Sequence, residues 1–168
     1  KLLVPSEAAD FGVITDIDDT ILQTGVVSTL KWKVFFNTVF KKAKNRLPFK
    51  GAPDLYNQLH RGVSGEMANP IFYVSHSPWN LYRYLELFLR QNNFPKGPIL
   101  LRSFQTFFKR KTALDKPQKQ LEILNLLKTY PKLPFILIGD SGEHDADIYK
   151  ELALLYPERI LAIYLRSV

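Results

Sequence analysis

The sequence contains no cysteine, and this absence excludes two classes of protein. Without cysteine the chain can build neither a disulfide-stabilised scaffold nor a thiolate nucleophile. Long apolar runs are lacking too. None approaches the roughly 18 residues that a membrane-spanning helix needs, and no signal-peptide pattern opens the chain. The chain begins abruptly with KLLVPSEAAD, so we expect a trimmed or excised domain.

The composition is that of an ordinary soluble globular domain, with 46% hydrophobic and 23% charged residues. We expect residues 1–168 to form a single domain, because this length suffices for one sizeable core. The net charge is +7, from 23 Lys and Arg against 16 Asp and Glu. This excess favours an acidic partner, such as a phosphate substrate, an anionic membrane or nucleic acid. A generically basic protein is the alternative.

Five short apolar runs have the pattern of strands that are buried on both faces. They are FGVIT (11–15), PIFYVS (70–75), GPILL (97–101), PFILIG (134–139) and RILAIYL (159–165). Four segments between them have apolar residues at helical spacing, namely 53–62, 79–93, 117–130 and 145–157. This alternation predicts an α/β fold, a Rossmann-like parallel sheet with helices on both faces. Ligands bind such sheets at the carboxyl ends of the strands.

Three of the predicted strands end in acidic or hydroxyl-bearing residues. The segments are DIDDT (16–20), SHS (75–77) and GDSGEHD (139–145). Each alone suits an ordinary turn, but together they predict an acidic pocket with hydroxyls. Asp16 and Asp18 point the same way if the backbone is extended. With Asp140 from a second strand they suit Mg²⁺, which would also remove the repulsion between a carboxylate and a phosphate.

The motifs resemble those of known phosphotransferases. DIDDT is the D-x-D-x-T signature of the haloacid-dehalogenase type, and FYVS and GDSGEHD resemble its second and fourth motifs. Four longer segments resemble the catalytic domain of actin-patch-protein-type phosphatidate phosphatases over about residues 11–166: FGVITDIDDTI, FYVSHSPWNLY, NNFPKGPILLR and FILIGDSGEHDADIY. The resemblance implies a Mg²⁺-dependent phosphomonoester hydrolase with an aspartyl-phosphate intermediate. Its substrate would be phosphatidate or a related lipid phosphate, cleaved to phosphate and diacylglycerol.

The resemblance also implies a role for individual residues. Asp16 would be the nucleophile, and Asp18 the general acid and then the base. Ser75 would bind a phosphoryl oxygen, and a lysine would neutralise the nucleophile and the developing charge. The metal ligands would be Asp16, Asp18, Asp140 and Asp145, with Asp18 contributing its backbone carbonyl.

The identity of the lysine is open between Lys116 and Lys119, which both precede the LEILNLL segment. We favour Lys119 as catalytic and substrate-binding, because it has an isoleucine four residues on, as in the family. Arg102, at the end of GPILLR, is a candidate for binding the substrate phosphate or headgroup, with an ordinary salt bridge as the alternative. His76 and Asp19 are interpreted as structural, since extended spacing turns them away from their neighbours.

Residues 29–49 carry Trp and Phe on one face of a predicted helix and lysines beside the other. We interpret this segment as a small helical cap insert after the first strand, one that contacts an anionic membrane or grips acyl chains. A helix that packs its aromatic face on the core is the alternative. A second stretch, FQTFFKRK (104–111), repeats the aromatic and basic composition.

Other functions stay open at this point. The same fold could act on a soluble phosphomonoester or a phosphoprotein. A non-enzymatic receiver-like module also combines acidic residues, a hydroxyl and a lysine around a phosphorylated Asp, but it is typically shorter and keeps its acidic pair adjacent. Nucleic-acid binding rests on charge alone, and we expect none. We expect a cytoplasmic protein with peripheral contact to membranes.

Overall fold

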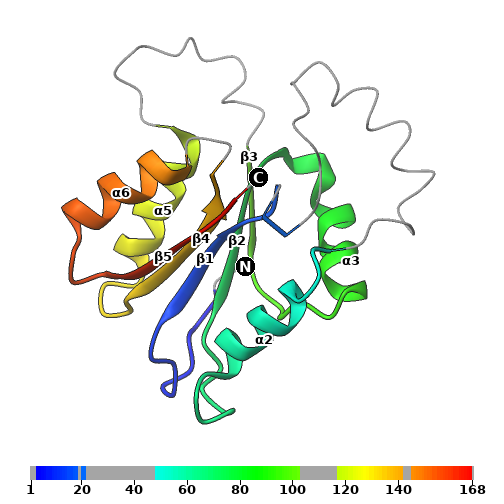
Figure 1. The fold of residues 1–168 in the computed structure, drawn as a ribbon, viewed down its shortest axis with the longest axis horizontal. Helices are drawn as coiled ribbons and strands as arrows, with labels where there is room; N and C mark the ends of the chain where they lie inside the picture. The colour runs from blue at the N-terminus through cyan, green and yellow to red at the C-terminus, as the bar shows by residue number, and fades with distance from the viewer. Residues whose placement is uncertain (1–2, 19, 22–47, 103–116, 142–144, 168) are drawn as a thin grey trace.

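The fold comes from a computed structural model, which describes residues 3–18, 20–21, 48–102, 117–141 and 145–167. In these residues five strands form one sheet in the order β3-β2-β1-β4-β5, and every neighbouring pair is parallel (Figure 1). They are β1 (Gly12–Asp16), β2 (Ile71–Pro78), β3 (Ile99–Arg102), β4 (Phe135–Asp140) and β5 (Ile160–Arg166). The predicted parallel α/β fold is confirmed, and each predicted strand overlaps an observed one.

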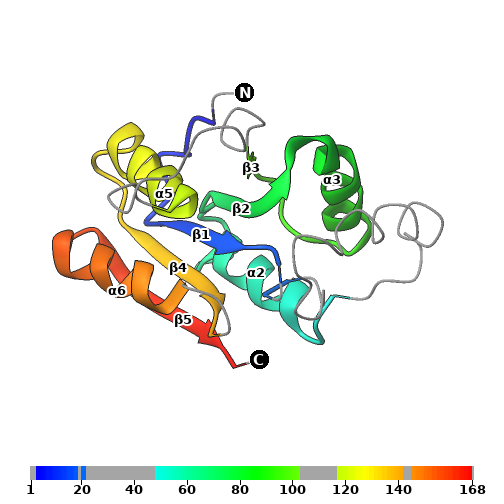
Figure 2. The same cartoon turned by 90° about the horizontal axis from the view of Figure 1, so that it is seen from above.

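Helices cover both faces of the sheet, as the sequence predicts. Helices α2 and α3 lie on one face, and α5 and α6 on the other (Figure 2). Their bounds are α2 (Ala52–Arg61), α3 (Tyr82–Gln91), α5 (Gln118–Thr129) and α6 (Asp145–Leu155), with a short 3-10 helix η2 (Trp79–Leu81) before α3. None of these described helices has the length and apolarity to cross a bilayer. The predicted cap insert lies outside the described residues, apart from its last two positions.

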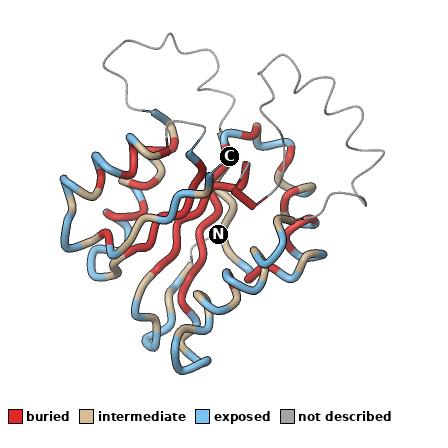
Figure 3. The backbone as a smooth tube through the Cα atoms, viewed as in Figure 1, coloured by how far each residue is buried: buried red, intermediate tan, exposed pale blue. Residues whose placement is uncertain are grey.

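Side chains of the central strands alternate between two apolar layers. Val13 of β1 and Ile71 of β2 pack in the layer under α2 and α3, while Ile14 and Phe72 pack under α5 and α6. This alternation follows from the two-residue repeat of a strand. Because β1 and β2 are buried on both faces (Figure 3), their sequences are continuous apolar runs.

A buried asparagine joins the start of β1 to α2 at the amino edge of the sheet. The Oδ1 of Asn69 accepts hydrogen bonds from the backbone N–H groups of Asp10 (3.0 Å) and Phe11 (3.4 Å). Its Nδ2 donates to the carbonyl of Leu59 at 2.9 Å. Asn69 has no exposed surface, so these groups have no water to replace the amide if it is lost.

The substitution Asn69→Ala should therefore destabilise the fold without touching the opposite edge of the sheet. We expect the free energy of unfolding to fall by about 2–4 kcal/mol, because buried backbone groups lose their partners. Urea denaturation measures this. The control is Asn125→Ala on the exposed side of α5, for which we expect a change within about 0.5 kcal/mol. Equal effects of the two substitutions would contradict the assignment.

Candidate active site

The predicted site residues meet at the carboxyl edge of the sheet. β1 ends at Asp16, β4 ends at Asp140, and Ser75 lies near the end of β2. Because β1 lies between β2 and β4, these three strand ends are neighbours. The helices on one face add Lys119 in the first turn of α5 and Asp145 at the start of α6.

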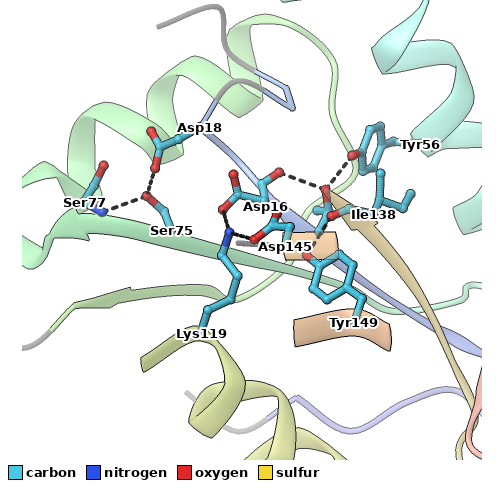
Figure 4. Close-up of polar contacts among 10 residues, drawn as sticks. Asp16, Asp18, Tyr56, Ser75, Ser77, Lys119, Ile138, Asp145 and Tyr149 are labelled. Atoms are coloured by element: carbon cyan, nitrogen blue, oxygen red, sulfur yellow. Dashed lines mark hydrogen bonds and ion pairs between the residues drawn. The ribbon is translucent and has the colours of Figure 1, made fainter. Parts of the chain in front are cut away.

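Lys119 is buried between two carboxylates. Its Nζ lies 2.9 Å from Oδ1 of Asp16 and forms a second ion pair with Asp145 (Figure 4). None of the three side chains is more than 1% exposed. Burial alone lowers the pKa of a lysine, but the two carboxylates outweigh burial and raise the pKa of Lys119. The ammonium group therefore stays charged at any physiological pH.

Asp16 occupies an environment that disfavours its charge. Burial is the main cause that raises the pKa of Asp16, and the nearby Asp18 and Asp145 carboxylates add to it, whereas Lys119 opposes it. Oδ2 of Asp16 is buried and has no hydrogen-bond partner among the described residues. A buried oxygen left in this way is costly, so the site is suited to a cation or an electrophile at that atom.

Three buried carboxylates could hold a metal ion. Asp16, Asp140 and Asp145 each offer an oxygen, and these oxygens lie within 4.8 Å of one another. Carboxylate oxygens at this spacing suit a hard divalent cation such as Mg²⁺. Asp16, Asp140 and Asp145 are three of the four metal ligands that the sequence resemblance implies, and they come from β1, β4 and α6.

The side chain of Asp18 lies outside this cluster and is held by Ser75. The Oγ of Ser75 donates to Oδ2 of Asp18 at 2.7 Å. We expected Asp16 and Asp18 to converge on one cation, which requires an extended backbone through Ile17. Among the described residues, the side chain of Asp18 is not part of the carboxylate cluster, so its place at the cation stays a prediction. Lys119 contacts Asp16 and Ser75 contacts Asp18, so different side chains hold the two carboxylates.

Two tyrosines that the sequence did not indicate support the backbone around Asp16 and Asp145. Tyr56 shares a hydrogen bond with the hydroxyl of Thr15, which in turn donates to the carbonyl of Asp16 at 2.9 Å (Figure 4). Tyr149 lies one helical turn after Asp145, and its hydroxyl donates to the backbone of β4 at 3.1 Å. Burial raises the pKa of both tyrosines, so they stay neutral. The four-residue spacing could have indicated Tyr149, but no sequence signal pairs Tyr56 with Thr15.

Gly139 provides space for this arrangement. A Cβ at this position would collide with the carboxylate of Asp145 and lie 2.8 Å from Cε2 of Tyr149. The glycine of the GDSGEHD motif is therefore required for close approach of α6 to β4.

The family can now be stated from comparison with known proteins. Residues 11–167 match the family described as "Phosphatidate phosphatase APP1, catalytic domain". The chain belongs to this family. Phosphatidate phosphatase APP1 of Saccharomyces cerevisiae is 40% identical over 156 residues, which is 92% of this chain and 25% of that protein. An uncharacterized protein of Schizosaccharomyces pombe is 32% identical over 157 residues, which is 93% of this chain and 25% of that protein. The chain thus spans about a quarter of the length of these relatives.

The structure does not describe every residue that the sequence singled out. Lys116, Asp19 and the side chain of Arg102 are outside the described residues, so their roles stay predictions. Arg102 itself is the last residue of β3. His76 is exposed between two buried serines, as strand alternation requires.

The raised pKa of Asp16 predicts that, without a metal ion, this side chain makes the free energy of unfolding depend on pH. Asp16 has a higher pKa in the folded state than in the unfolded state, so its contribution to stability is present at low pH and is lost as the pH rises through the folded pKa. We expect Asp16→Asn to raise the free energy of unfolding near neutral pH in EDTA. The gain should shrink toward about pH 4, the usual pKa of an aspartate.

The matched control is Asp147→Asn, the same substitution at an exposed position of α6. Because this side chain is exposed, its substitution should change the free energy of unfolding near neutral pH by no more than about 0.5 kcal/mol. Destabilisation by Asp16→Asn near neutral pH in EDTA would show that the Lys119 ion pair outweighs the burial of the carboxylate.

Proposed function

We propose that this chain is a phosphatidate phosphatase domain, a Mg²⁺-dependent phosphomonoester hydrolase that works through an aspartyl phosphate on Asp16. The observation that carries the proposal is the buried Lys119, ion-paired with Asp16 and Asp145, in a chain of the APP1 catalytic-domain family. A bare carboxylate repels a phosphate, so a nucleophilic aspartate needs fixed positive charge beside it.

The cluster fits the expected cation. Asp16, Asp140 and Asp145 would hold Mg²⁺ through carboxylate oxygens. When bound, the ion would neutralise charge on these carboxylates and on the phosphoryl oxygens. The backbone carbonyl of Asp18 is a further ligand that the haloacid-dehalogenase resemblance implies.

The first step uses the free oxygen of Asp16. Its Oδ1 is held by Lys119, which leaves Oδ2 to attack phosphorus in line with the ester oxygen. The new P–O bond to Asp16 forms as the ester P–O bond breaks, and the electron pair goes to the leaving oxygen. Asp18 gives that oxygen a proton, and Ser75 orients the Asp18 carboxyl group through its hydrogen bond.

The second step regenerates the enzyme. Asp18, now a carboxylate, takes a proton from a water molecule that attacks the phosphorus of the aspartyl phosphate. The acyl P–O bond breaks, its electron pair returns to the Asp16 carboxylate, and phosphate is released. Lys119 remains beside Asp16 throughout and stabilises the charge that develops there.

Phosphatidate is proposed as the substrate on two grounds. The family and the yeast relative carry that activity in their names. The net charge of +7 also favours an acidic lipid. The aromatic and basic segments 29–49 and 104–111 lie almost wholly outside the described residues, so their part in gripping the lipid stays a prediction.

Phosphate release from phosphatidate in mixed micelles and from p-nitrophenyl phosphate tests the proposal. We expect Mg²⁺-dependent release from both. Asp16→Asn and Lys119→Met should each lower it by at least about a thousandfold, because they remove the nucleophile and its counter-charge. The control is Lys128→Met, which removes an exposed lysine from the last turn of the same helix and should leave the rate unchanged.

The outcomes separate the alternatives. Release from p-nitrophenyl phosphate alone would keep the mechanism and contradict the lipid substrate. No release from either ester would contradict the enzyme. A phosphorylated aspartate that persists without turnover would then favour a receiver-like module.

A further inference from the structure

An exposed tryptophan follows the strand that carries Ser75. Trp79 begins η2 directly after β2 ends at Pro78, and 58% of its surface is exposed. A single exposed apolar residue is common on soluble proteins and means little by itself. What distinguishes Trp79 is its place at the carboxyl edge of the sheet, four residues from Ser75.

A bulge in β2 lies between the buried Ser75 and this tryptophan. Ser75 pairs with Leu101 and Pro78 pairs with Arg102, so β2 advances three residues while β3 advances one. Bulges of this kind redirect side chains next to functional sites. Here Ser75 is turned into the site, and the chain then emerges at the surface with Trp79 exposed.

The chemistry of this edge suits the interface of an anionic lipid layer. Tryptophan prefers the headgroup region, where its ring is buried among apolar groups and its N–H keeps a polar partner. Arg102 of β3 pairs in register with Pro78, the residue that precedes Trp79. The chain as a whole carries a net charge of +7, which complements a negative lipid surface.

We propose that Trp79 is a membrane anchor that brings the carboxyl edge of the sheet against an anionic lipid layer. Its ring enters the headgroup region, so that the phosphate of a phosphatidate molecule reaches Asp16 while its acyl chains stay in the layer. This inference rests on the lipid substrate proposed above. It adds the surface through which the domain meets that substrate.

A kinetic test compares Trp79→Ala with the parent protein on two substrates, phosphatidate in phosphatidylcholine vesicles and p-nitrophenyl phosphate in solution. We expect the ratio of lipid to soluble activity to fall about tenfold, the loss of one interfacial aromatic contact. Trp79→Phe should restore much of the ratio, because phenylalanine keeps an apolar ring. Val63→Ala is the control, since Val63 is fully exposed after α2 at the opposite edge.

A binding test needs no turnover. The chain has two tryptophans, Trp32 and Trp79, so Trp32→Phe leaves Trp79 as the sole reporter. With Asp16→Asn added to prevent hydrolysis, the emission of Trp79 should shift to shorter wavelength with vesicles that contain phosphatidate, and less with phosphatidylcholine alone. A reporter moved to the other edge, with Val63→Trp and both native tryptophans replaced by phenylalanine, should show no shift.

Three results would overturn the anchor. One is an equal loss of both activities in Trp79→Ala, which would place Trp79 in the reaction pocket. The second is an unshifted Trp79 emission with vesicles that the parent protein hydrolyses. The third is an equal shift from the reporter at position 63. If the proposed lipid substrate is wrong, the parent protein will cleave only the soluble ester. The emission test would still decide whether Trp79 binds lipid.

Discussion

The buried ammonium group of Lys119 is the charge on which the candidate site depends. Asp16, Asp140 and Asp145 present carboxylate oxygens within 4.8 Å of one another in the interior, where like charges repel strongly. Lys119 contacts two of the three and keeps its proton because of them. Loss of the Lys119 charge would leave two buried carboxylates without their counter-charge, which typically costs about 3–5 kcal/mol of stability, so both the fold and the chemistry depend on this lysine. A bound divalent cation would supply the remaining positive charge.

The register of the sheet explains how residues far apart in sequence reach this contact. Asp16 is level with Val74 of β2, and Thr15 is level with Ile138 of β4. Ser75 and Gly139 therefore lie at the end of β1 on its two sides. The absent side chain at Gly139 lets Asp145 and Tyr149 approach. Parallel strands all end at one edge, so a few short motifs after different strands form one site.

Much of this arrangement could be predicted from the sequence. Continuous apolar runs identified the five strands that the structure describes, and helical spacing identified its four described helices. Burial on both faces was wrong for β5, an edge strand on which Leu161, Tyr164 and Leu165 are exposed. The acidic and hydroxyl residues at three strand ends indicated where the site lies. The partners of individual side chains could not be predicted in the same way. The contact of Ser75 with Asp18 and the contact of Tyr56 with Thr15 both depend on packing between elements. Neither leaves a periodic signal.

The central claim is that Asp16 becomes phosphorylated and that Asp18 serves the two proton transfers, and one trapping measurement tests it directly. In Asp18→Asn, p-nitrophenyl phosphate should still react, because its leaving group needs little protonation, whereas hydrolysis of the intermediate lacks its base. After mixing with substrate and Mg²⁺ and quenching in acid, peptide mass spectrometry should find one phosphoryl group on Asp16, matched by one equivalent of p-nitrophenol. One equivalent of p-nitrophenol with the phosphoryl group on another residue, or on none, would contradict the account.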